Sequence, residues 1–305
     1  MAFTLRQLQF FVAAAEQASV SGAARALSIS QSSVTEAIQS LEDDLGVVLF
    51  ERRARGLELT HKGSLFLRHA SQILGDVASA RIAFREEEGD LTGRLSLGVT
   101  SLVAGYVLSD MLSRFRRAWP KVELSAVEDS ADYLQHLLIG GELDVAVLLT
   151  SSIRDRAAMQ VESLLVSPYR LWLPTGHRLN AAEAISLDDL AGESLIALTV
   201  DEIEESTRRM MAALSVKPHI AFRTRSVEAV RSMVATGAGV AILSDMVYRP
   251  WSLEGDRIEA RLIDDDVPSM NVGLAWKRGA KLDPCAKALR DFCHITYNSA
   301  GAMTV

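Results

Sequence analysis

The hydrophobic pattern of the chain changes near residue 90, and this change limits the folds that are open to it. Before that point apolar residues recur at helical spacing or in a short hairpin pattern. After Gly93, short apolar runs alternate with helical segments. Such alternation indicates an α/β fold with parallel strands. The acidic run from Glu86 to Asp90 separates the two patterns and is typical of a solvated hinge.

The first 60 residues predict three helices and a small β-hairpin. Ser21 suits the start of the second helix, because a serine hydroxyl can accept a hydrogen bond from a free N–H of the first turn. Gly46 suits the end of the third, because glycine adopts the left-handed backbone at little cost. The expected elements are helices at 5–17, 22–27 and 31–45, and a hairpin within 47–60 with its turn at Arg55-Gly56.

A long helix is predicted next, from His61 to Glu88. Its apolar residues are Phe66, Ala70, Ile73, Val77, Ala80 and Phe84, and their spacing alternates between four and three positions. This heptad spacing pairs two helices side by side. We expect this helix to join the same helix of a second chain, because no other predicted element nearby is long enough to cover it. The alternative is a core helix that packs only on its own domain.

The rest of the chain predicts two similar lobes with a cleft between them. Each lobe has three strands alternating with helices, and an extended stretch at about 160–174 joins them. The expected strands are 95–99, 122–127 and 143–149 in lobe 1, and 194–198, 219–223 and 240–243 in lobe 2. The expected helices are 104–118 and 130–139 in lobe 1, and 202–213 and 226–236 in lobe 2. The tail, with a strand at 269–277 and a helix at 283–295, is expected to return to lobe 1.

Composition places the chain among ordinary globular proteins, with 49% hydrophobic and 23% charged residues. No apolar run reaches the roughly 18 residues that a membrane helix needs, and the first residues lack the pattern of a signal peptide. We therefore expect a cytoplasmic protein without membrane contact. Cys285 and Cys293 have no metal-ligand spacing and are expected to be reduced thiols.

Enzyme motifs are absent from the sequence. It contains no His-Glu-x-x-His, Cys-x-x-Cys or Gly-x-Ser-x-Gly, and its six histidines are scattered. Gly237 and Gly239 lie between a helix and a strand, which is the wrong order for a dinucleotide loop. We expect no enzyme activity, no metal and no cofactor. A two-lobed solute-binding protein without a DNA role is the other alternative, but it would need a signal peptide and has no use for the first 90 residues.

Net charge gives little support for DNA binding. The chain carries −7, and the five basic and seven acidic side chains of residues 1–60 give that region −2. A prediction of DNA binding must therefore depend on the geometry of particular residues and not on net charge. Three of the five arginines do cluster between Arg52 and Arg55, so positive charge is concentrated there.

The predicted helix at 31–45 has the pattern of a recognition helix. Val34, Ile38 and Leu41 share its apolar face, and the opposite face carries Ser32, Thr35, Glu36, Gln39 and Ser40. Short hydroxyl and amide side chains suit base edges in a major groove. Gln31 and Ser32 lie at the helix N-terminus, where free N–H groups can meet a phosphate. The alternative is a helical bundle with an ordinary polar surface.

The sequence resembles the LysR-type transcriptional regulators over nearly its whole length. The N-terminal matches are Leu5-Arg6-Gln7-Leu8-Gln9-Phe10-Phe11, Ala23-Ala24-Arg25-Ala26-Leu27, Ser30-Gln31-Ser32-Ser33-Val34-Thr35, Ile38 to Gly46, Leu49-Phe50-Glu51-Arg52 and Leu59-Thr60-His61-Lys62-Gly63. Later matches are Gly141 to Ala146, Leu187 to Gly192 and Gly237 to Leu243.

This resemblance implies a winged helix-turn-helix at 1–60, a linker and dimerisation helix at 61–90 and an effector-binding domain at 91–305. Within that domain, lobe 1 takes about 91–162 plus 267–305, and lobe 2 takes about 163–266. The resemblance also implies a homodimer through the linker helix, a homotetramer that bends double-stranded DNA, and an effector that alters the access of RNA polymerase.

By the same resemblance, DNA is contacted by Gln31, Ser32 and Thr35 from the recognition helix and by Arg52, Arg53 and Arg55 from the wing. Two positions depart from the family pattern: Glu36 stands where a basic residue is common, and Ser32 where proline is common. Glu36 can accept a hydrogen bond from cytosine N4, or it can stay solvated and repel phosphate.

Candidate effector residues follow the strands of both lobes, because ligands of open α/β sheets bind beyond the carboxyl ends of strands. They are Thr100, Ser101, Ser130, Thr199 and Ser226. Hydroxyls next to helix N-termini suit a small organic acid. The alternative is that they only cap helices, a role for which Ser130 and Ser226 are well placed. The acidic cluster Asp201, Glu202, Glu204 and Glu205 favours a solvated surface, with an amine-bearing ligand as the alternative.

Overall fold

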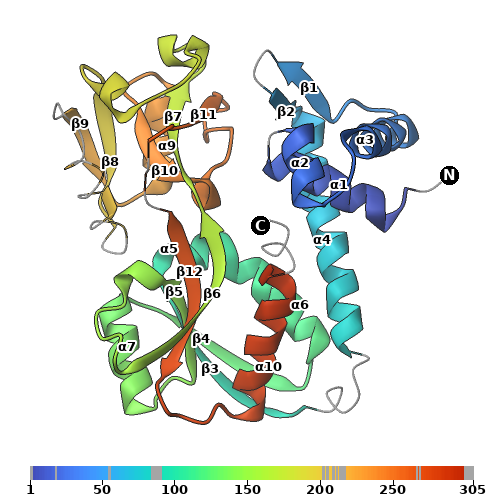
Figure 1. Ribbon diagram of the computed structural model, residues 1–305. Helices are drawn as coiled ribbons and strands as arrows, with labels where there is room; N and C mark the ends of the chain where they lie inside the picture. The colour runs from blue at the N-terminus through green and yellow to red at the C-terminus, as the bar shows by residue number, and fades with distance from the viewer. Residues whose placement is uncertain are drawn as a thin grey trace. The chain divides into compact units, whose positions relative to one another are not determined.

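The computed structural model describes residues 3–17, 19–53, 56–83, 91–200, 203, 206–207, 210, 212, 218–265, 267 and 269–298. The chain divides into two compact units (Figure 1). The first unit comprises residues 1–92, 112–121 and 288–305, and the second comprises 93–111 and 122–287. Residues 112–121 and 288–305, which the sequence pattern assigns to lobe 1, thus cluster with the N-terminal region.

Three short helices build the N-terminal core of the first unit. They are α1 (Leu5–Glu16), α2 (Val20–Ala26) and α3 (Gln31–Leu45). Thr4 and Gln7 form a reciprocal capping box that starts α1. Ser19, not Ser21, is the N-cap of α2: its Oγ accepts from the backbone N–H of Gly22 at 3.2 Å and lies 2.8 Å from the Ser21 Oγ. The prediction of Ser21 was wrong because two serines so close together are equally good caps by type.

A two-stranded wing follows the recognition helix. Strands β1 (Phe50–Arg53) and β2 (Gly56–Leu59) pair antiparallel, as predicted, and the Arg55 end of the turn lies outside the described residues. Glu42 on α3 accepts from the backbone N–H groups of Leu49 and Phe50 at 2.6 and 3.0 Å. The acidic end of α3 therefore holds the wing rather than facing solvent alone.

Helix α4 (His61–Ala83) begins directly after the wing, and its first turn lies close to the backbone of Leu49, which precedes β1. Thr60 caps it, because its Oγ1 accepts from the N–H of Gly63 at 2.9 Å. A Cβ on Gly63 would collide with the carbonyl oxygen of Leu49. Only glycine therefore fits where the long helix passes the start of the wing.

The heptad seam of α4 is not free along its whole length. Ala70 is fully buried in the core of the three N-terminal helices, and Phe66 and Ile73 pack against that core. Phe66 also makes edge contacts with Phe3 and Phe11. The expectation that nothing nearby covers the seam was therefore wrong for its first half. Val77 is half-buried, and Phe84 lies outside the described residues.

Two arginines of α6 (Ser109–Ala118) contact the middle of α4. Arg114 is buried and donates from Nη2 to the carbonyl oxygen of Ser71 at 3.3 Å. Arg117 pairs with Asp76 at 3.1 Å. A side chain on Gly75 would occupy the place of the Arg114 guanidinium. These contacts dock α6 on α4 within the first unit.

Lobe 1, within the second unit, is built on a five-stranded sheet of order β4-β3-β5-β12-β6. β3 runs parallel to β4 and β5, whereas β12 runs antiparallel to β5 and β6. β6 and β12 lie side by side (Figure 1). The tail strand thus returns to lobe 1, as the sequence predicts. The bounds are β3 (Gly93–Val99), β4 (Val122–Glu128), β5 (Val145–Leu149), β6 (Met159–Ser167) and β12 (Met270–Lys277).

The helices of this part of the chain depart from expectation in one place. The predicted helix at 104–118 begins earlier and contains a π turn, giving α5 (Ser101–Val103), η1 (Ala104–Leu108) and then α6. Such turns are rare and often mark functional sites. The other helical segments are α7 (Ala131–Gly140), η2 (Thr150–Ser152), α10 (Pro284–Cys293) and η6 (His294–Asn298).

Lobe 2 has a three-stranded sheet of order β10-β7-β11 and a parallel pair, β8-β9. Pro168 is the only residue between β6 of lobe 1 and β7 of lobe 2. Much of the predicted helix at 202–213, including Asp201, Glu202, Glu204 and Glu205, lies outside the described residues. The elements are β7 (Tyr169–Pro174), η3 (Arg178–Ala181), η4 (Leu187–Leu190), β8 (Ser194–Leu198), β9 (His219–Thr224), α9 (Val227–Ala235), β10 (Ala241–Ser244), η5 (Asp245–Val247) and β11 (Ile258–Leu262).

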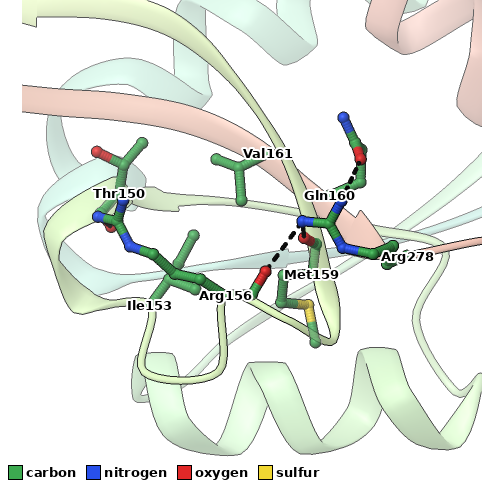
Figure 2. A pocket seen from close by; sticks show the side chains of 7 residues that line it. All are labelled: Thr150, Ile153, Arg156, Met159, Gln160, Val161 and Arg278. Atoms are coloured by element: carbon green, nitrogen blue, oxygen red, sulfur yellow. Dashed lines mark hydrogen bonds between the residues drawn. The ribbon is translucent and has the colours of Figure 1, made fainter.

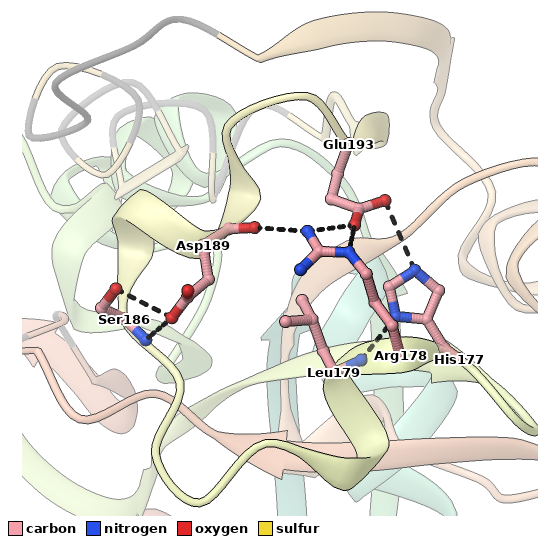
Figure 3. A network of polar contacts seen from close by, with 6 residues as sticks. All are labelled: His177, Arg178, Leu179, Ser186, Asp189 and Glu193. Carbon is pink, nitrogen blue, oxygen red and sulfur yellow. Dashed lines mark hydrogen bonds and ion pairs between the residues drawn. The ribbon is translucent and has the colours of Figure 1, made fainter.

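A polar network ties η3 and η4 together in lobe 2 (Figure 3). Arg178 donates to the Glu193 carboxylate from Nε at 3.0 Å and to the carbonyl oxygen of Asp189 at 3.1 Å. The Nε2 atom of His177 lies 3.4 Å from the same Glu193 carboxylate. Hydrogen bonds from Ser186 lower the pKa of Asp189. This network holds a stretch of chain that has little regular structure.

Candidate DNA interface and effector cleft

Helix α3 presents its polar face to solvent. Gln31, Ser32, Glu36, Gln39 and Ser40 are exposed and Thr35 is half-buried. On the opposite side Val34, Ile38 and Leu41 are 0%, 6% and 0% exposed. The face that the sequence predicts for DNA contact is therefore accessible to solvent. The apolar face packs into the core of the N-terminal helices.

The start of α3 is held by a cluster of serine hydroxyls. The Oγ of Ser30 accepts from the N–H of Ser33 at 3.2 Å and lies 2.9 Å from the Ser32 Oγ. The Oγ1 of Thr35 donates to the carbonyl oxygen of Gln31 at 2.9 Å. A hydroxyl has one proton and two lone pairs. Since Thr35 uses its proton inside the helix, it can offer acceptor lone pairs to an amino group on a base edge.

Gln7 is a contributor that sequence reasoning missed. Its Nε2 donates to the Oγ of Ser40 at 3.0 Å, which ties α1 to the outer face of α3. Gln7 also takes part in the capping box of α1. The capping pattern was visible in the sequence, but the bond to Ser40 depends on how the two helices cross.

The wing arginines are only partly described. Arg52 lies opposite Leu57 and Arg53 opposite Gly56 in the hairpin register. The side chains of these two arginines and the whole of Arg55 lie outside what the structure describes. Their role in DNA binding therefore rests on the register alone.

Thr100 differs from the other candidate effector residues. It follows β3, is 0% exposed, and its N–H donates to the carbonyl oxygen of Val147 at 3.4 Å. No group in the described part of the chain hydrogen-bonds to its Oγ1. A buried polar group without a partner is unfavourable. A ligand or a water bound next to Thr100 would relieve it.

The remaining hydroxyls are accounted for locally or face solvent. Ser130 caps α7 by accepting from the N–H of Tyr133 at 3.4 Å, and Ser226 caps α9 by accepting from Ala229 at 3.2 Å. Thr199 donates to the carbonyl oxygen of Thr224 at 3.2 Å. Ser101 is exposed. The capping alternative therefore describes Ser130 and Ser226.

Tyr106 connects the two lobes and was not among the predicted site residues. It lies on the π turn η1 of lobe 1, and its hydroxyl donates to the Glu228 carboxylate on α9 of lobe 2 at 3.3 Å. The Arg249 guanidinium lies 5.4 Å from its ring centre. Burial raises the pKa of Tyr106. The spacing of residues in the sequence does not predict that Tyr106 contacts lobe 2, because the direction of its side chain depends on the π turn.

Arg231 supports this contact from inside lobe 2. It is 2% exposed, forms an ion pair with Glu228, and donates from Nη2 to the carbonyl oxygen of Val247 at 2.8 Å. Its guanidinium lies 5.7 Å from the centre of the Trp172 ring. A buried arginine thus positions the carboxylate that receives Tyr106.

Metal and thiol chemistry find little support in the described residues. No group of three or more His, Cys, Asp or Glu side chains among them is arranged to hold a metal. Cys285 and Cys293 are buried and not joined in a disulfide, and burial raises the pKa of both thiols. Within the described chain, no helix is both long and apolar enough to cross a membrane.

The comparisons with known proteins agree with this architecture. Residues 5–64 match the bacterial regulatory helix-turn-helix protein, lysR family, and residues 88–296 match the LysR substrate binding domain. The regulator YwqM of Bacillus subtilis is 29% identical over 96% of this chain and 99% of its own, and OxyR of Escherichia coli is 26% identical over 94% of each. The structure of HinK, a LysR family transcriptional regulator of Pseudomonas aeruginosa, superposes with a TM-score of 0.62 at 29% identity over 96% of this chain and 97% of that one.

The two matched models together span both the exposed recognition helix and the two-lobed region, so a solute-binding protein without a DNA role is disfavoured. The predicted α/β architecture with an N-terminal helix-turn-helix is confirmed. The chain belongs to the LysR family of DNA-binding transcription regulators with an effector-binding domain.

Proposed function

We propose that this regulator, acting in the cytoplasm and not as an enzyme, reads double-stranded DNA with the outer face of α3 and grips the backbone with the wing. The observation that carries the proposal is the burial pattern of α3, which exposes Gln31, Ser32 and Glu36 while Val34 and Leu41 are enclosed. Thr35 and Glu36 would contact base edges, because both can accept hydrogen bonds from base amino groups. Gln31 and Ser32 would meet phosphate at the helix N-terminus.

The wing arginines Arg52, Arg53 and Arg55 would supply contacts that do not depend on sequence. Phosphate contacts release counterions, so each one adds to the salt dependence of binding. Arg52→Ala should weaken binding to all duplexes alike and reduce the slope of log affinity against log salt by about 0.9. Thr35→Ala should instead change which base is preferred, by about 1–3 kcal/mol at one position.

Gel-shift titrations at several salt concentrations test both expectations. They use a duplex selected for binding to this protein and single-base variants of that duplex. The assignment fails if Arg52→Ala leaves the salt slope unchanged and Thr35→Ala leaves the order of preferred sites unchanged. Gln9→Ala, which removes an exposed amide on α1 outside the recognition helix, serves as the matched control.

We further propose that a small organic acid binds between the lobes beside Thr100 and Ser101, with Ser130, Thr199 and Ser226 at the other strand ends. The hydroxyl of Thr100 supports this place most directly, because it is buried and has no hydrogen-bond partner in the part of the chain that the structure describes. Among the five candidates, Ser130 and Ser226 have the weaker support, because each already caps a helix.

Reversible binding suits this chain better than thiol oxidation. OxyR and the hydrogen peroxide-inducible genes activators are relatives at 26–28% identity. Peroxide-sensing thiols are accessible and of low pKa. The chain has two cysteines, and both are buried with raised pKa values. We therefore propose that this regulator does not use cysteine oxidation as its signal.

A thermal-shift screen of small carboxylic acids against their neutral amides tests the effector class. A true ligand raises the unfolding temperature, and the rise continues with the logarithm of ligand concentration above the dissociation constant. The expected hit is an acid whose effect is lost in Thr100→Val, a substitution that keeps the shape of the side chain. An effector that acts equally on Thr100→Val would remove Thr100 from the site.

We also propose the domain limits 1–60, 61–90 and 91–305 and an assembly of four chains. The second half of α4 would pair two chains. The edge strands β4 and β9 would join dimers into a tetramer, since each exposes an apolar side chain, Val127 at 38% and Phe222 at 42%. Effector binding would then shift the tetramer between two shapes and change the access of RNA polymerase. Light scattering that gives a monomer at DNA-binding concentrations would contradict this assembly.

A further inference from the structure

A pocket of about 210 Å³ lies in lobe 1 beside the turn that leads into β6. Figure 2 shows the seven side chains that line it. They are Thr150, Ile153, Arg156, Met159, Gln160, Val161 and Arg278. Thr150 directly follows β5, and none of the five proposed effector residues lines the pocket. The pocket is therefore separate from the proposed effector site.

One of its two arginines is rigidly held. The guanidinium of Arg278 donates to the carbonyl oxygens of Arg156, Ala157 and Met159 at 3.0, 2.8 and 2.7 Å. It also donates from Nη1 to the Oε1 of Gln160 at 3.3 Å. These partners are neutral, so the positive charge of Arg278 is fixed in place without being balanced. A guanidinium has five N–H donors, so one donor on Nη1 is left.

The second arginine is tethered at only one point. Arg156 is exposed, and its Nη2 donates to the carbonyl oxygen of Thr150 at 3.3 Å. Among the described residues no carboxylate lies within ion-pair distance of Arg156 or Arg278, and none lines the pocket. The neighbouring Arg154, by contrast, pairs with Asp132 at 2.9 Å. Two guanidinium groups thus border one pocket, and no carboxylate in the described part of the chain compensates them.

The rest of the lining is apolar. Met159 and Ile153 are 0% and 6% exposed, and Val161 is half-buried. In Figure 2 the side chains of Ile153 and Val161 lie between the two guanidinium groups. Such a pocket matches a molecule with a short hydrocarbon body and a negative end, because the body can be desolvated against these side chains while arginine receives the charge in planar hydrogen bonds.

We propose that this pocket is an accessory binding site for a small aliphatic carboxylate, separate from the effector site beside Thr100. Arg156 is the recognition residue, since most of its donors are uncommitted, and Arg278 supplies a fixed positive field. The tether of Arg156 ends on Thr150, directly after β5, and the N–H of Thr100 donates to the carbonyl oxygen of Val147 in the same strand. Occupancy of the pocket therefore acts on a strand that neighbours the proposed effector site.

The methyl group of Met159 offers a local probe. The full-length protein, labelled with ¹³C at the methionine methyls, is titrated with sodium valerate, with valeramide at equal ionic strength as the neutral control. A Met159→Leu variant identifies the resonance. We expect a saturable shift of the Met159 signal with valerate and none with valeramide. Arg156→Gln removes a charge-assisted hydrogen bond, so this variant should bind valerate about tenfold or more weakly than the parent protein.

Arg154→Gln is the matched control, because it removes an exposed arginine of the same turn that already has a carboxylate partner. It should bind valerate like the parent protein, as should Thr100→Val, which separates this site from the proposed effector site. The inference is overturned if valeramide is as effective as valerate, if Arg156→Gln binds unchanged, or if the Met159 signal shows no saturable shift. Loss of the response in Thr100→Val would instead assign the binding to the effector site.

Discussion

The recognition helix and the lobe region assemble their polar groups in opposite ways. On α3, the candidate contact residues of the helix share one 15-residue element, so helical periodicity alone decides which side chains face outward. In the lobes, the five candidate hydroxyls come from four separate places along the chain, since Thr100 and Ser101 are neighbours. The role of each then depends on the neighbouring groups: the hydroxyl of Thr100 has no partner among the described residues, whereas Ser130 and Ser226 cap helices.

This difference teaches which kind of site a single sequence can specify. A site on one regular element follows from the spacing of residue types. A site at strand ends follows from tertiary contacts, as Tyr106 shows by reaching Glu228 across the lobes from a π turn that has no sequence signature.

The largest effect is expected at the core face of α3. Leu41 is fully buried in the N-terminal core, so Leu41→Ala should lower the free energy of unfolding of that region by about 2–5 kcal/mol. Gln39→Ala, on the exposed face, should change it by less than about 0.5 kcal/mol. Chemical denaturation of the two variants measures the contrast. Similar effects for both would show that the face assignment of α3 is wrong.

A comparable effect is expected in lobe 2 at high pH. Burial raises the pKa of Tyr169 from 10.0 to about 12. The folded state then keeps a proton that the unfolded chain releases, so stability is full below pH 10 and falls as the pH rises from 10 to 12. The loss amounts to about 2–3 kcal/mol, at 1.36 kcal/mol per pKa unit. Unfolding titrations across this range should show a shallower decline for Tyr169→Phe, and an equal decline would contradict the prediction.

A smaller effect is expected from the contact between the lobes. Tyr106→Phe removes the hydroxyl that donates to Glu228 and keeps the ring near Arg249. The loss of one hydrogen bond should cost about 0.5–1.5 kcal/mol. If the free energy of this contact differs between the effector-free and the effector-bound protein, Tyr106→Phe should change the affinity for the effector by the factor that corresponds to this difference. Calorimetric titration of both proteins with the same acid measures it, and unchanged affinity would limit Tyr106 to a structural role.

An effect of similar size separates caps from ligand contacts. Ser226→Ala should lower stability by about 1 kcal/mol because α9 loses its N-cap, and Ser226→Asp should restore it. If Ser226 is only a cap, effector affinity should be equal in both variants. Thermal unfolding with and without the effector distinguishes the cases: a loss of effector response in Ser226→Ala that Ser226→Asp does not restore would make Ser226 a ligand contact.

Several features of the fold could be predicted because they depend on local sequence. The strand pattern of lobe 1, the return of the tail to its sheet and the Gly46 end of α3 all follow from periodicity and backbone preference. The Ser21 cap was predicted wrongly because residue type does not separate two close serines. The seam of α4 was misjudged because an a/d pattern does not say whether the covering partner is a second chain or, as for Ala70, the domain's own core.

The sequence by itself determined the change of hydrophobic pattern near residue 90, most of the described elements on either side and the outward face of α3, since these depend on the order of apolar and polar residues along short segments. Only the tertiary structure decided which hydroxyl lacks a partner, where Tyr106 ends, and that Arg156 and Arg278 border one pocket. Hydrogen bonds and charge balance depend on distances between segments that are remote in the sequence. Thr100 and Ser226 are both polar residues that follow a strand, yet the folded environment leaves one buried without a partner and gives the other a helix to cap.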